Sequence, residues 1–129
     1  MQVESLLEKE LPPQVAAEIQ ELQHLAFPAE QVFAQQRWWH APLLPEERWF
    51  LCRREGRLIG SVRVIPRTIL AAGKPYTIGA IGNVCSHPQF RGVGAAKAVM
   101  GAVAGYIAAG NVDFGVLMCG GAHDYYAKL

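Results

Sequence analysis

One glycine-rich turn constrains the fold of this chain more than any other feature. Residues 89–94 are Gln-Phe-Arg-Gly-Val-Gly, and they join a β-branched, glycine-dotted run at 76–85 to an alanine-rich run at 93–109. The first run is typical of a strand, and the second strongly favours a helix. Residues 113–119 then form an apolar segment typical of a short buried strand. The order strand, helix, strand predicts a mixed α/β sheet with a crossover helix.

Upstream of this unit, the pattern predicts helices followed by antiparallel hairpins. Apolar residues recur at three- and four-residue spacing from Val15 to Ala26, directly after two prolines, which indicates an amphipathic helix. Gly56 supplies the positive backbone dihedral angle that a tight turn requires. The other expected elements are a helix at 29–40, strands at 49–54 and 58–65, a turn at 72–75, a bulge at Gly79 or Gly82, and a helix at 123–129.

Two glycines interrupt the alanine-rich helix. Gly101 and Gly105 each lower helix propensity by about 1 kcal/mol relative to alanine, and we expect them to let the helix pack closely on the sheet. Their spacing also matches the GxxxG pattern of membrane helices. The apolar run at 98–110 is too short to span a bilayer, however, so we interpret it as a buried helix and expect no membrane association.

Composition and charge narrow the class of protein. A chain of 129 residues that is 51% hydrophobic and 18% charged fits one domain, residues 1–129. Its net charge of +1 provides no field that would attract nucleic acid. Cys52, Cys85 and Cys119 are widely separated and form neither a zinc motif nor a disulfide framework. We therefore expect no metal and a reducing, cytoplasmic location.

The glycine-rich turn has the chemistry of a phosphate site. Backbone N–H groups and the positive end of the helix dipole converge where the helix begins. Gly92 and Gly94 let a ligand approach the backbone closely, while Gln89 and Arg91 can reach phosphate oxygens. The dinucleotide fingerprint is excluded because Lys97 occupies its third glycine position, and the sequence contains no GxxxxGK[ST] loop.

The sequence around this turn resembles a known family. Within residues 83–96, Gln89, Gly92 and Gly94 have the spacing of the acetyl-CoA motif of the GCN5-related N-acetyltransferases, or GNATs. The similarity covers about residues 48–129, and the hairpin and helix lengths look more narrowly like the aminoglycoside 2'-N-acetyltransferase branch. The resemblance implies a GNAT-like acyl-CoA N-acyltransferase fold. It also implies transfer of an acetyl group from acetyl-CoA to a primary amine.

The resemblance further implies roles for individual residues. The backbone of Val84, Cys85 and Ser86 would pair with the pantetheine arm, and a donor in a bulge would polarise the thioester carbonyl. Tyr126, in a Tyr-x-Lys-Leu sequence similar to that of the family, is the expected general acid, with Tyr125 as the alternative. The residues expected to hold the pyrophosphate are Gln89, Phe90, Arg91, Gly92, Val93, Gly94 and Ala95.

The general base and the acceptor stay open. Aminoglycoside-like sugars, polyamines, other small amines and protein amino groups all suit a nearly neutral chain. A ping-pong route through Cys85 or Cys119 is disfavoured because burial in an apolar strand suppresses thiol reactivity, so we expect direct attack by the amine. The candidate bases are Glu46, Glu47, Asp113, His123 and Asp124. We expect structural roles for His24, His40 and His87, whereas Trp38, Trp39 and Trp49 either pack at the core edge or line an acceptor pocket.

The chain departs from the family pattern at its end. The family continues with two further strands after the tyrosine-bearing helix, whereas the sequence stops at Leu129. We therefore expect a domain truncated after its fourth helix and a homodimer that covers the edge of the strand at 112–119. The alternative function is an acetyl-CoA-binding module without turnover. Gly92→Val is expected to abolish cofactor binding with little loss of fold.

Overall fold

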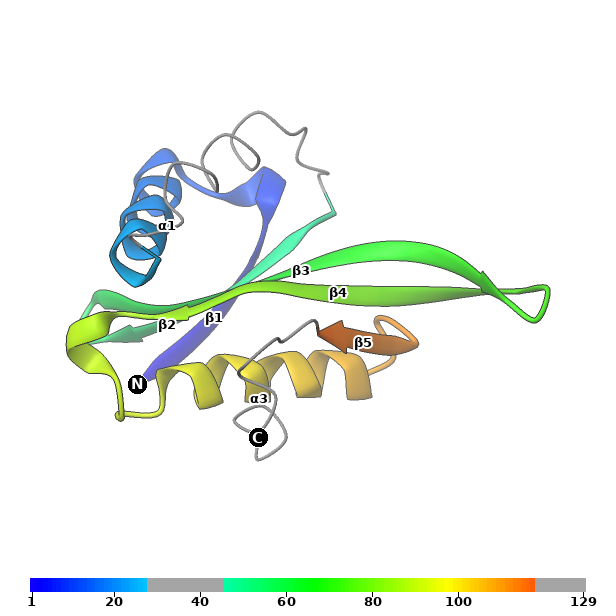
Figure 1. The fold of residues 1–129 in the computed structure, drawn as a ribbon. Coiled ribbons are helices and arrows are strands. Elements are labelled where there is room, and N and C mark those ends of the chain that lie inside the picture. Colours follow the sequence, from blue (N-terminus) through cyan, green and yellow to red (C-terminus); the bar gives the residue numbers. More distant parts are fainter. Residues whose placement is uncertain (28–45, 118–129) are drawn as a thin grey trace.

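Five strands of the described chain form one mixed sheet whose spatial order follows the sequence. The computed structural model describes residues 1–27 and 46–117 (Figure 1). The first four strands pair antiparallel, β5 runs parallel to β4, and the helix α3 (Ala95–Ala108) joins these last two. The predicted crossover in a mixed sheet is thus confirmed. The strands are β1 (Gln2–Leu7), β2 (Arg48–Arg54), β3 (Arg57–Ala71), β4 (Lys74–Ser86) and β5 (Phe114–Leu117).

The two described α-helices cover opposite faces of the sheet (Figure 1). α1 (Pro13–Ala26) buries Val15, Ile19 and Leu22 against side chains of β2, β3 and β4. α3 buries its own apolar stripe against the other face of β2 and β3. Neighbouring residues of β2, such as Phe50 and Leu51, point into different cores because side chains alternate along a strand.

The sequence pattern does not predict β1. Most residues of β1 are exposed, and the strand lies at the edge of the sheet, where it pairs with β2. Cross-strand pairing rather than a local apolar pattern therefore holds it in place. The 3-10 helix η1 (Glu8–Glu10) then leads to α1, which begins at Pro13 and ends at Ala26, as the spacing predicts.

Both hairpin turns place two consecutive residues in the left-handed conformation. Glu55 and Gly56 have φ angles of 53° and 79°, and Ala72 and Gly73 have φ angles of 52° and 78°. Such pairs are typical of type I′ turns, whose twist matches that of the flanking strands. The prediction for Gly56 is confirmed, and the second turn is shorter than the expected four residues.

β3 is longer than the strand at 58–65 that the sequence predicts, and it continues through Pro66. The pairing of β3 with β2 ends at Val64, so the missing N–H of Pro66 costs no hydrogen bond on that side. Beyond this point β3 pairs with β4 as far as Ala71. The resulting hairpin projects past both helices (Figure 1).

The expectation that the strand after α3 is buried is wrong. Phe114 and Val116 of β5 keep 53% and 44% of their surface exposed. β5 lies beside the projecting part of the hairpin, whereas α1 covers the other end of the sheet (Figure 1). The Phe114 ring contacts Tyr76 of β4, with ring centres 5.7 Å apart. The opposite face of β5 lies close to α3, since a Cβ added to Gly115 would lie 2.5 Å from Ile107.

The expected role of the α3 glycines is also wrong. A Cβ added to Gly101 or Gly105 would meet no atom of residues 1–27 and 46–117 within 4 Å, and both glycines are exposed. The close approach between helix and sheet depends instead on a glycine of the sheet. A Cβ at Gly60 of β3 would lie 3.0 Å from the Cβ of Ala95. The first turn of α3 therefore packs tightly on β3, while its glycines face outward.

Candidate functional site

The turn before α3 is built around two left-handed glycines. β4 ends at Ser86, and the 3-10 helix η2 (Pro88–Phe90) follows. Gly92 and Gly94 have φ angles of 87° and 88°, in a region that residues with a Cβ adopt only at a cost. Gly94 is the N-cap residue of α3, and as a glycine it has no side chain that could cap the helix. The helix begins at Ala95, two residues later than the sequence predicts.

This geometry concentrates backbone donors at one end of α3. The first N–H groups of a helix have no carbonyl partner within it, and the first side chains here, those of Ala95 and Ala96, contain no acceptor. The helix dipole adds a partial positive charge at the same place. Together with the left-handed conformations of Gly92 and Gly94 in the turn, these features suit a phosphate or pyrophosphate group.

The residues that the sequence assigns to this turn divide into two groups. Gln89, Arg91 and the two glycines are exposed, so their polar atoms are accessible to a ligand. Phe90 and Val93 are partly buried and pack against the α3 core. Ala95 is fully buried, so it can contribute only its backbone N–H. The structure thus brings the predicted loop residues together around the start of α3.

β4 contains a bulge beside the residues expected to pair with the pantetheine arm. Between two matched pairs, β3 advances from Ser61 to Arg63, while β4 covers the longer distance from Cys85 back to Gly82. One extra residue therefore lies at positions 83–84. The bulge is adjacent to the second of the two glycines expected to host it, and it precedes Ser86 at the end of the strand.

The two parallel strands pair over a short stretch. Residues 78–81 of β4 pair with residues 114–117 of β5. Past Ile81, β4 is still paired with β3, and none of the described strands pairs with its other edge. An extended ligand could add to that edge through main-chain hydrogen bonds. Val84, Cys85 and Ser86 lie on this segment.

His87 has the structural role that we expected, and it holds the start of the turn. Its side chain is buried, and its backbone N–H donates to the carbonyl of Ile59 at 2.8 Å. Its Nδ1 accepts a hydrogen bond from the backbone N–H of Gln89 at 3.1 Å. The side chain of His87 thereby caps η2.

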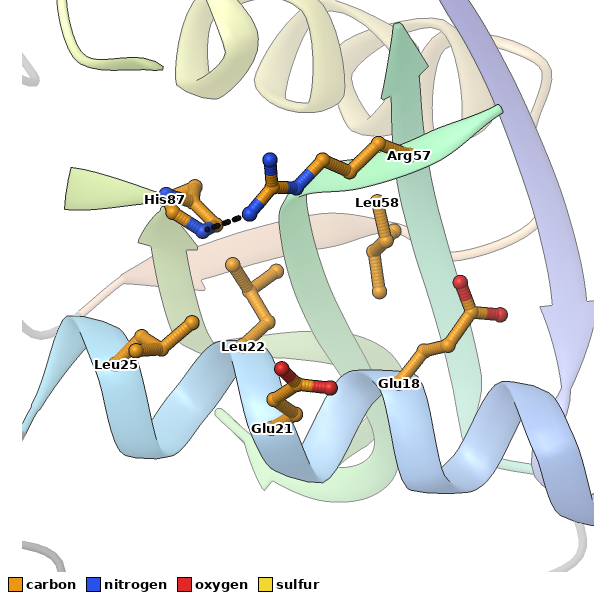
Figure 2. Close-up of a pocket in the computed structure, with 7 residues that line it drawn as sticks. All are labelled: Glu18, Glu21, Leu22, Leu25, Arg57, Leu58 and His87. Atoms are coloured by element: carbon orange, nitrogen blue, oxygen red, sulfur yellow. Dashed lines mark hydrogen bonds between the residues drawn. The ribbon is translucent and has the colours of Figure 1, made fainter. Parts of the chain in front are cut away.

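A small cavity of about 80 Å³ lies between α1 and the start of β3, beside His87 (Figure 2). Glu18 at its rim binds both terminal guanidinium nitrogens of Arg53, at 2.8 and 2.9 Å, and these bonds lower the pKa of Glu18. Sequence reasoning missed Arg57, whose only local signal is its place directly after a turn. The lining residues are Glu18, Glu21, Leu22, Leu25, Arg57, Leu58 and His87.

The described cysteines are free and buried. Burial raises the pKa of Cys85 to about 11, and a contact with the Ser61 hydroxyl, at 3.2 Å, lowers it in part. Burial likewise raises the pKa of Cys52. A thiol that stays protonated is a poor nucleophile, which agrees with the expectation against a ping-pong route. Cys119 lies outside the described residues.

The candidate bases differ in their environments. Glu47 is buried and accepts hydrogen bonds from the Arg63 guanidinium, so an amine arriving from solvent cannot reach it in this conformation. The Asp113 carboxylate accepts the backbone N–H of Thr77 at 2.8 Å. Glu46 is exposed. His123, Asp124, Tyr125 and Tyr126 lie outside the described residues.

One of the three tryptophans falls in the described part of the chain. Trp49 is buried in the α1 core, its indole N–H donates to the carboxylate of Glu8, and the Arg63 guanidinium lies 5.9 Å from its ring centre. This placement favours packing over pocket lining for Trp49. Trp38, Trp39, His40 and the expected helix at 29–40 lie outside the described residues.

No helix within residues 1–27 and 46–117 is long and apolar enough to cross a membrane. Within the same residues, no group of three or more His, Cys, Asp or Glu side chains is arranged to hold a metal ion.

The family of this chain follows from a comparison with protein-family models. The model of the acetyltransferase (GNAT) domain matches residues 9–129. The chain belongs to the GNAT acetyltransferase family. The resemblance seen around the glycine-rich turn is thereby confirmed, and so is the mixed α/β GNAT-like fold. A search of curated protein sequences gives no match.

Solved structures share this fold at low sequence identity. A probable N-acyltransferase from Enterococcus faecalis is 21% identical with a TM-score of 0.73, over 98% of this chain and 32% of that one. The ribosomal-protein-alanine N-acetyltransferase of Brucella melitensis is 18% identical with a TM-score of 0.67, over 99% and 87%. An aminoglycoside acetyltransferase from a soil metagenome, solved with trehalose, is 16% identical with a TM-score of 0.67, over 98% and 82%. The chain therefore spans about a third of the length of the first of these proteins, and these similarities establish the fold alone.

Proposed function

We propose that this chain is an N-acetyltransferase that transfers an acetyl group from acetyl-CoA to a primary amine. The observation that carries the proposal is the start of α3, where two left-handed glycines precede a helix whose N-cap residue, Gly94, has no side chain. That geometry suits the pyrophosphate of a coenzyme A thioester. Membership of the GNAT acetyltransferase family supports the same cofactor and reaction.

The bulged strand β4 supplies a place for the thioester end of the cofactor. The edge of Val84, Cys85 and Ser86 would pair with the amides of the pantetheine arm, as an added strand does. A backbone N–H beside the bulge would donate to the thioester carbonyl and stabilise the oxyanion that develops there, which can be worth about 3 kcal/mol. The turn from Gln89 to Ala95 would hold the pyrophosphate.

The chemistry that we propose is direct attack. The neutral amine nitrogen adds to the thioester carbonyl carbon, the C–S bond breaks, and the amine loses a proton to a base. Tyr126 would return a proton to the departing coenzyme A thiolate, with Tyr125 as the alternative. The protonated state of Cys85 at neutral pH argues against an acyl-cysteine intermediate.

The acceptor that we propose is a small amine, such as an aminoglycoside-like amino sugar, with a protein amino group as the other class. The name of the metagenomic relative supports the first class, and that of the Brucella relative supports the second. A net charge of +1 favours neither strongly cationic nor anionic acceptors. The free thiols Cys52 and Cys85 agree with a reducing, cytoplasmic location.

We also propose a homodimer that pairs through the β5 side of the sheet. The exposed side chains of Phe114 and Val116 support this, since β5 is the last of the described strands and exposed apolar residues there favour association. Light scattering at micromolar concentration should then give twice the mass of the 14.1 kDa chain. A monomeric mass would contradict the dimer and leave the enzymatic proposal unaffected.

The enzymatic proposal is tested by two measurements on the same protein. Calorimetric titration should show that acetyl-CoA binds, and a thiol reagent should detect coenzyme A release that depends on one member of a panel of amino sugars, polyamines and peptides with free amino groups. Binding without release for any member would favour a cofactor-binding module instead. A chain that does not bind acetyl-CoA would contradict both functions.

A further inference from the structure

The side chain of His87 lies where β4, the phosphate turn and the α1 cavity meet. Three hydrogen bonds fix this residue and its successors: its N–H to Ile59, the N–H of Phe90 to its carbonyl at 2.9 Å, and the N–H of Gln89 to its Nδ1. These bonds determine the path of the chain directly before Arg91 and Gly92. The direction in which the turn presents its N–H groups thus depends on His87.

The hydrogen-bond donors around the ring restrict its protonation. The N–H of Gln89 points at Nδ1, and a terminal guanidinium nitrogen of Arg57 lies 3.2 Å from Nε2 (Figure 2). Both groups are donors only, whereas a neutral imidazole has one acceptor nitrogen and an imidazolium has none. Only one of the two contacts can therefore be a hydrogen bond, and protonation of the ring would abolish both.

The backbone contact is the one that the geometry favours. The N–H of Gln89 is held in place by the 3-10 turn, whereas Arg57 is exposed and can turn its guanidinium toward water. The guanidinium carbon of Arg57 also lies 5.2 Å from the ring centre of Phe90, a cation–π contact that does not need the imidazole. Phe90 in turn packs edge-on against His87, with ring centres 5.2 Å apart.

Charged groups from the neighbouring elements surround this cluster. Arg57 approaches from β3, and Glu18 and Glu21 line the same cavity from α1 (Figure 2). Glu18 is paired with Arg53, so its charge is already balanced. Of these charged groups, Arg57 contacts the imidazole directly.

We propose that His87 is a positioning residue for the cofactor: its neutral ring, with Nδ1 as the acceptor, caps η2 and sets the phosphate-binding turn for coenzyme A. This inference rests on the proposed function, because the turn is taken to bind that cofactor. His87 itself contacts neither phosphate nor the reacting atoms in this role. Arg57 and Phe90 keep the ring in place by packing.

Three substitutions of His87 distinguish the role of Nδ1 from that of Nε2. The amide oxygen of asparagine can accept from the N–H two residues later, as Nδ1 does, and asparagine before proline favours such a turn. Glutamine instead places its polar group near the position of Nε2, and leucine removes both. His87→Asn should bind coenzyme A within about threefold of the unsubstituted chain, whereas His87→Gln and His87→Leu should bind about tenfold more weakly, the size expected for one lost hydrogen bond.

Enzyme kinetics test whether the substitutions weaken coenzyme A binding by misplacing the turn, and melting curves show whether each variant is folded. The weakened variants should raise KM for acetyl-CoA while leaving kcat and the KM for the amine within about twofold. Equal coenzyme A affinity in all three variants would overturn the inference, and so would an asparagine variant as weak as the leucine one when both are folded. Failure of the unsubstituted chain to bind coenzyme A would contradict the proposed function instead.

The state of the ring can be measured without any ligand. In nitrogen-15 NMR spectra of the unsubstituted chain, Nδ1 of His87 should have the shift of an unprotonated ring nitrogen, and Nε2 that of a protonated one. This measurement does not depend on variants that could fail to fold. A proton on Nδ1 at neutral pH would overturn the inference.

Discussion

Arg63 and Glu47 form an ion pair in which both side chains are almost fully buried, at 4% and 2% exposure. The guanidinium Nε donates to the carboxylate at 3.1 Å, and a terminal nitrogen donates to the same oxygen. The pair lies on the α1 side of the sheet, beside Trp49. A buried ion pair tolerates the loss of one partner poorly, because the other charge then stays buried without compensation.

Glu47→Leu should therefore lower the free energy of unfolding by about 3 kcal/mol. The double variant Glu47→Leu/Arg63→Met removes both charges and should be more stable than the single variant. Urea denaturation of the two proteins measures the difference. If the double variant were the less stable of the two, an uncompensated charge could not explain the loss.

Gly101→Ala and Gly105→Ala should each stabilise the protein by about 1 kcal/mol, because alanine is the better helix former and a Cβ there meets none of the described residues within 4 Å. Thermal melting provides the measurement. The matched control is Gly60→Ala, which should destabilise, since its Cβ would lie 3.0 Å from the Cβ of Ala95. A neutral result at both helix positions would indicate that another part of the chain covers this face.

Gly92→Val should impair both folding and cofactor binding, which revises the expectation of little loss of fold. The φ angle of 87° makes any side chain unfavourable there, although space is available. The left-handed conformation alone should lower the free energy of unfolding of the valine variant by about 1–2 kcal/mol. Acetyl-CoA affinity should fall at least tenfold in titrations of the folded protein, with Gly101→Ala as a control of unchanged affinity. Unaltered binding by the valine variant would refute the assignment of the turn.

Stability should decline at high pH because of Cys85. The pKa of an unfolded thiol is near 9.0, and burial raises that of Cys85 to about 11. Between these values the unfolded chain loses the proton while the native chain keeps it, so the stabilisation is complete below pH 9 and is lost as the pH approaches 11. The full loss is about 2–3 kcal/mol. Between pH 8 and pH 10.5, the melting temperature of the unsubstituted chain should fall further than that of Cys85→Ala. If the two melting temperatures fell in parallel, ionisation of Cys85 could not be the cause.

The sequence predicts those parts of the fold whose pattern is local. The spacing from Val15 to Leu22 corresponds to one packed face of α1, and Gly56 lies in the turn that its conformational freedom favours. β1 escapes prediction because its pairing partner, β2, lies more than forty residues away along the chain. The exposure of Phe114 could not be predicted either, because an apolar pattern does not show how far a helix extends over a sheet.

The glycine-rich turn at 89–94 was predictable because its backbone conformation depends on glycines at fixed spacing. Gly92 and Gly94 have the left-handed conformation that such a turn uses. The contact of His87 with Arg57 was not predictable, because it joins the end of β4 to the start of the neighbouring strand β3, and the two residues lie 30 positions apart in the sequence. The ion pair of Glu47 was likewise hidden, since charge pairing between distant residues leaves no periodic signal.

The bulge in β4 limits where the domain can tolerate insertions and deletions. Ile81 and Cys85 are four positions apart, so a regular strand would place them on the same face, yet Ile81 packs in the α3 core and Cys85 in the α1 core. The extra residue between them reverses the side-chain phase of the strand. Deleting one residue at 83–84 would turn Cys85 and the following His87 toward the wrong helix. Natural variants of this domain should therefore keep the length between Gly82 and His87, and accept insertions at the exposed tip, Ala72–Gly73.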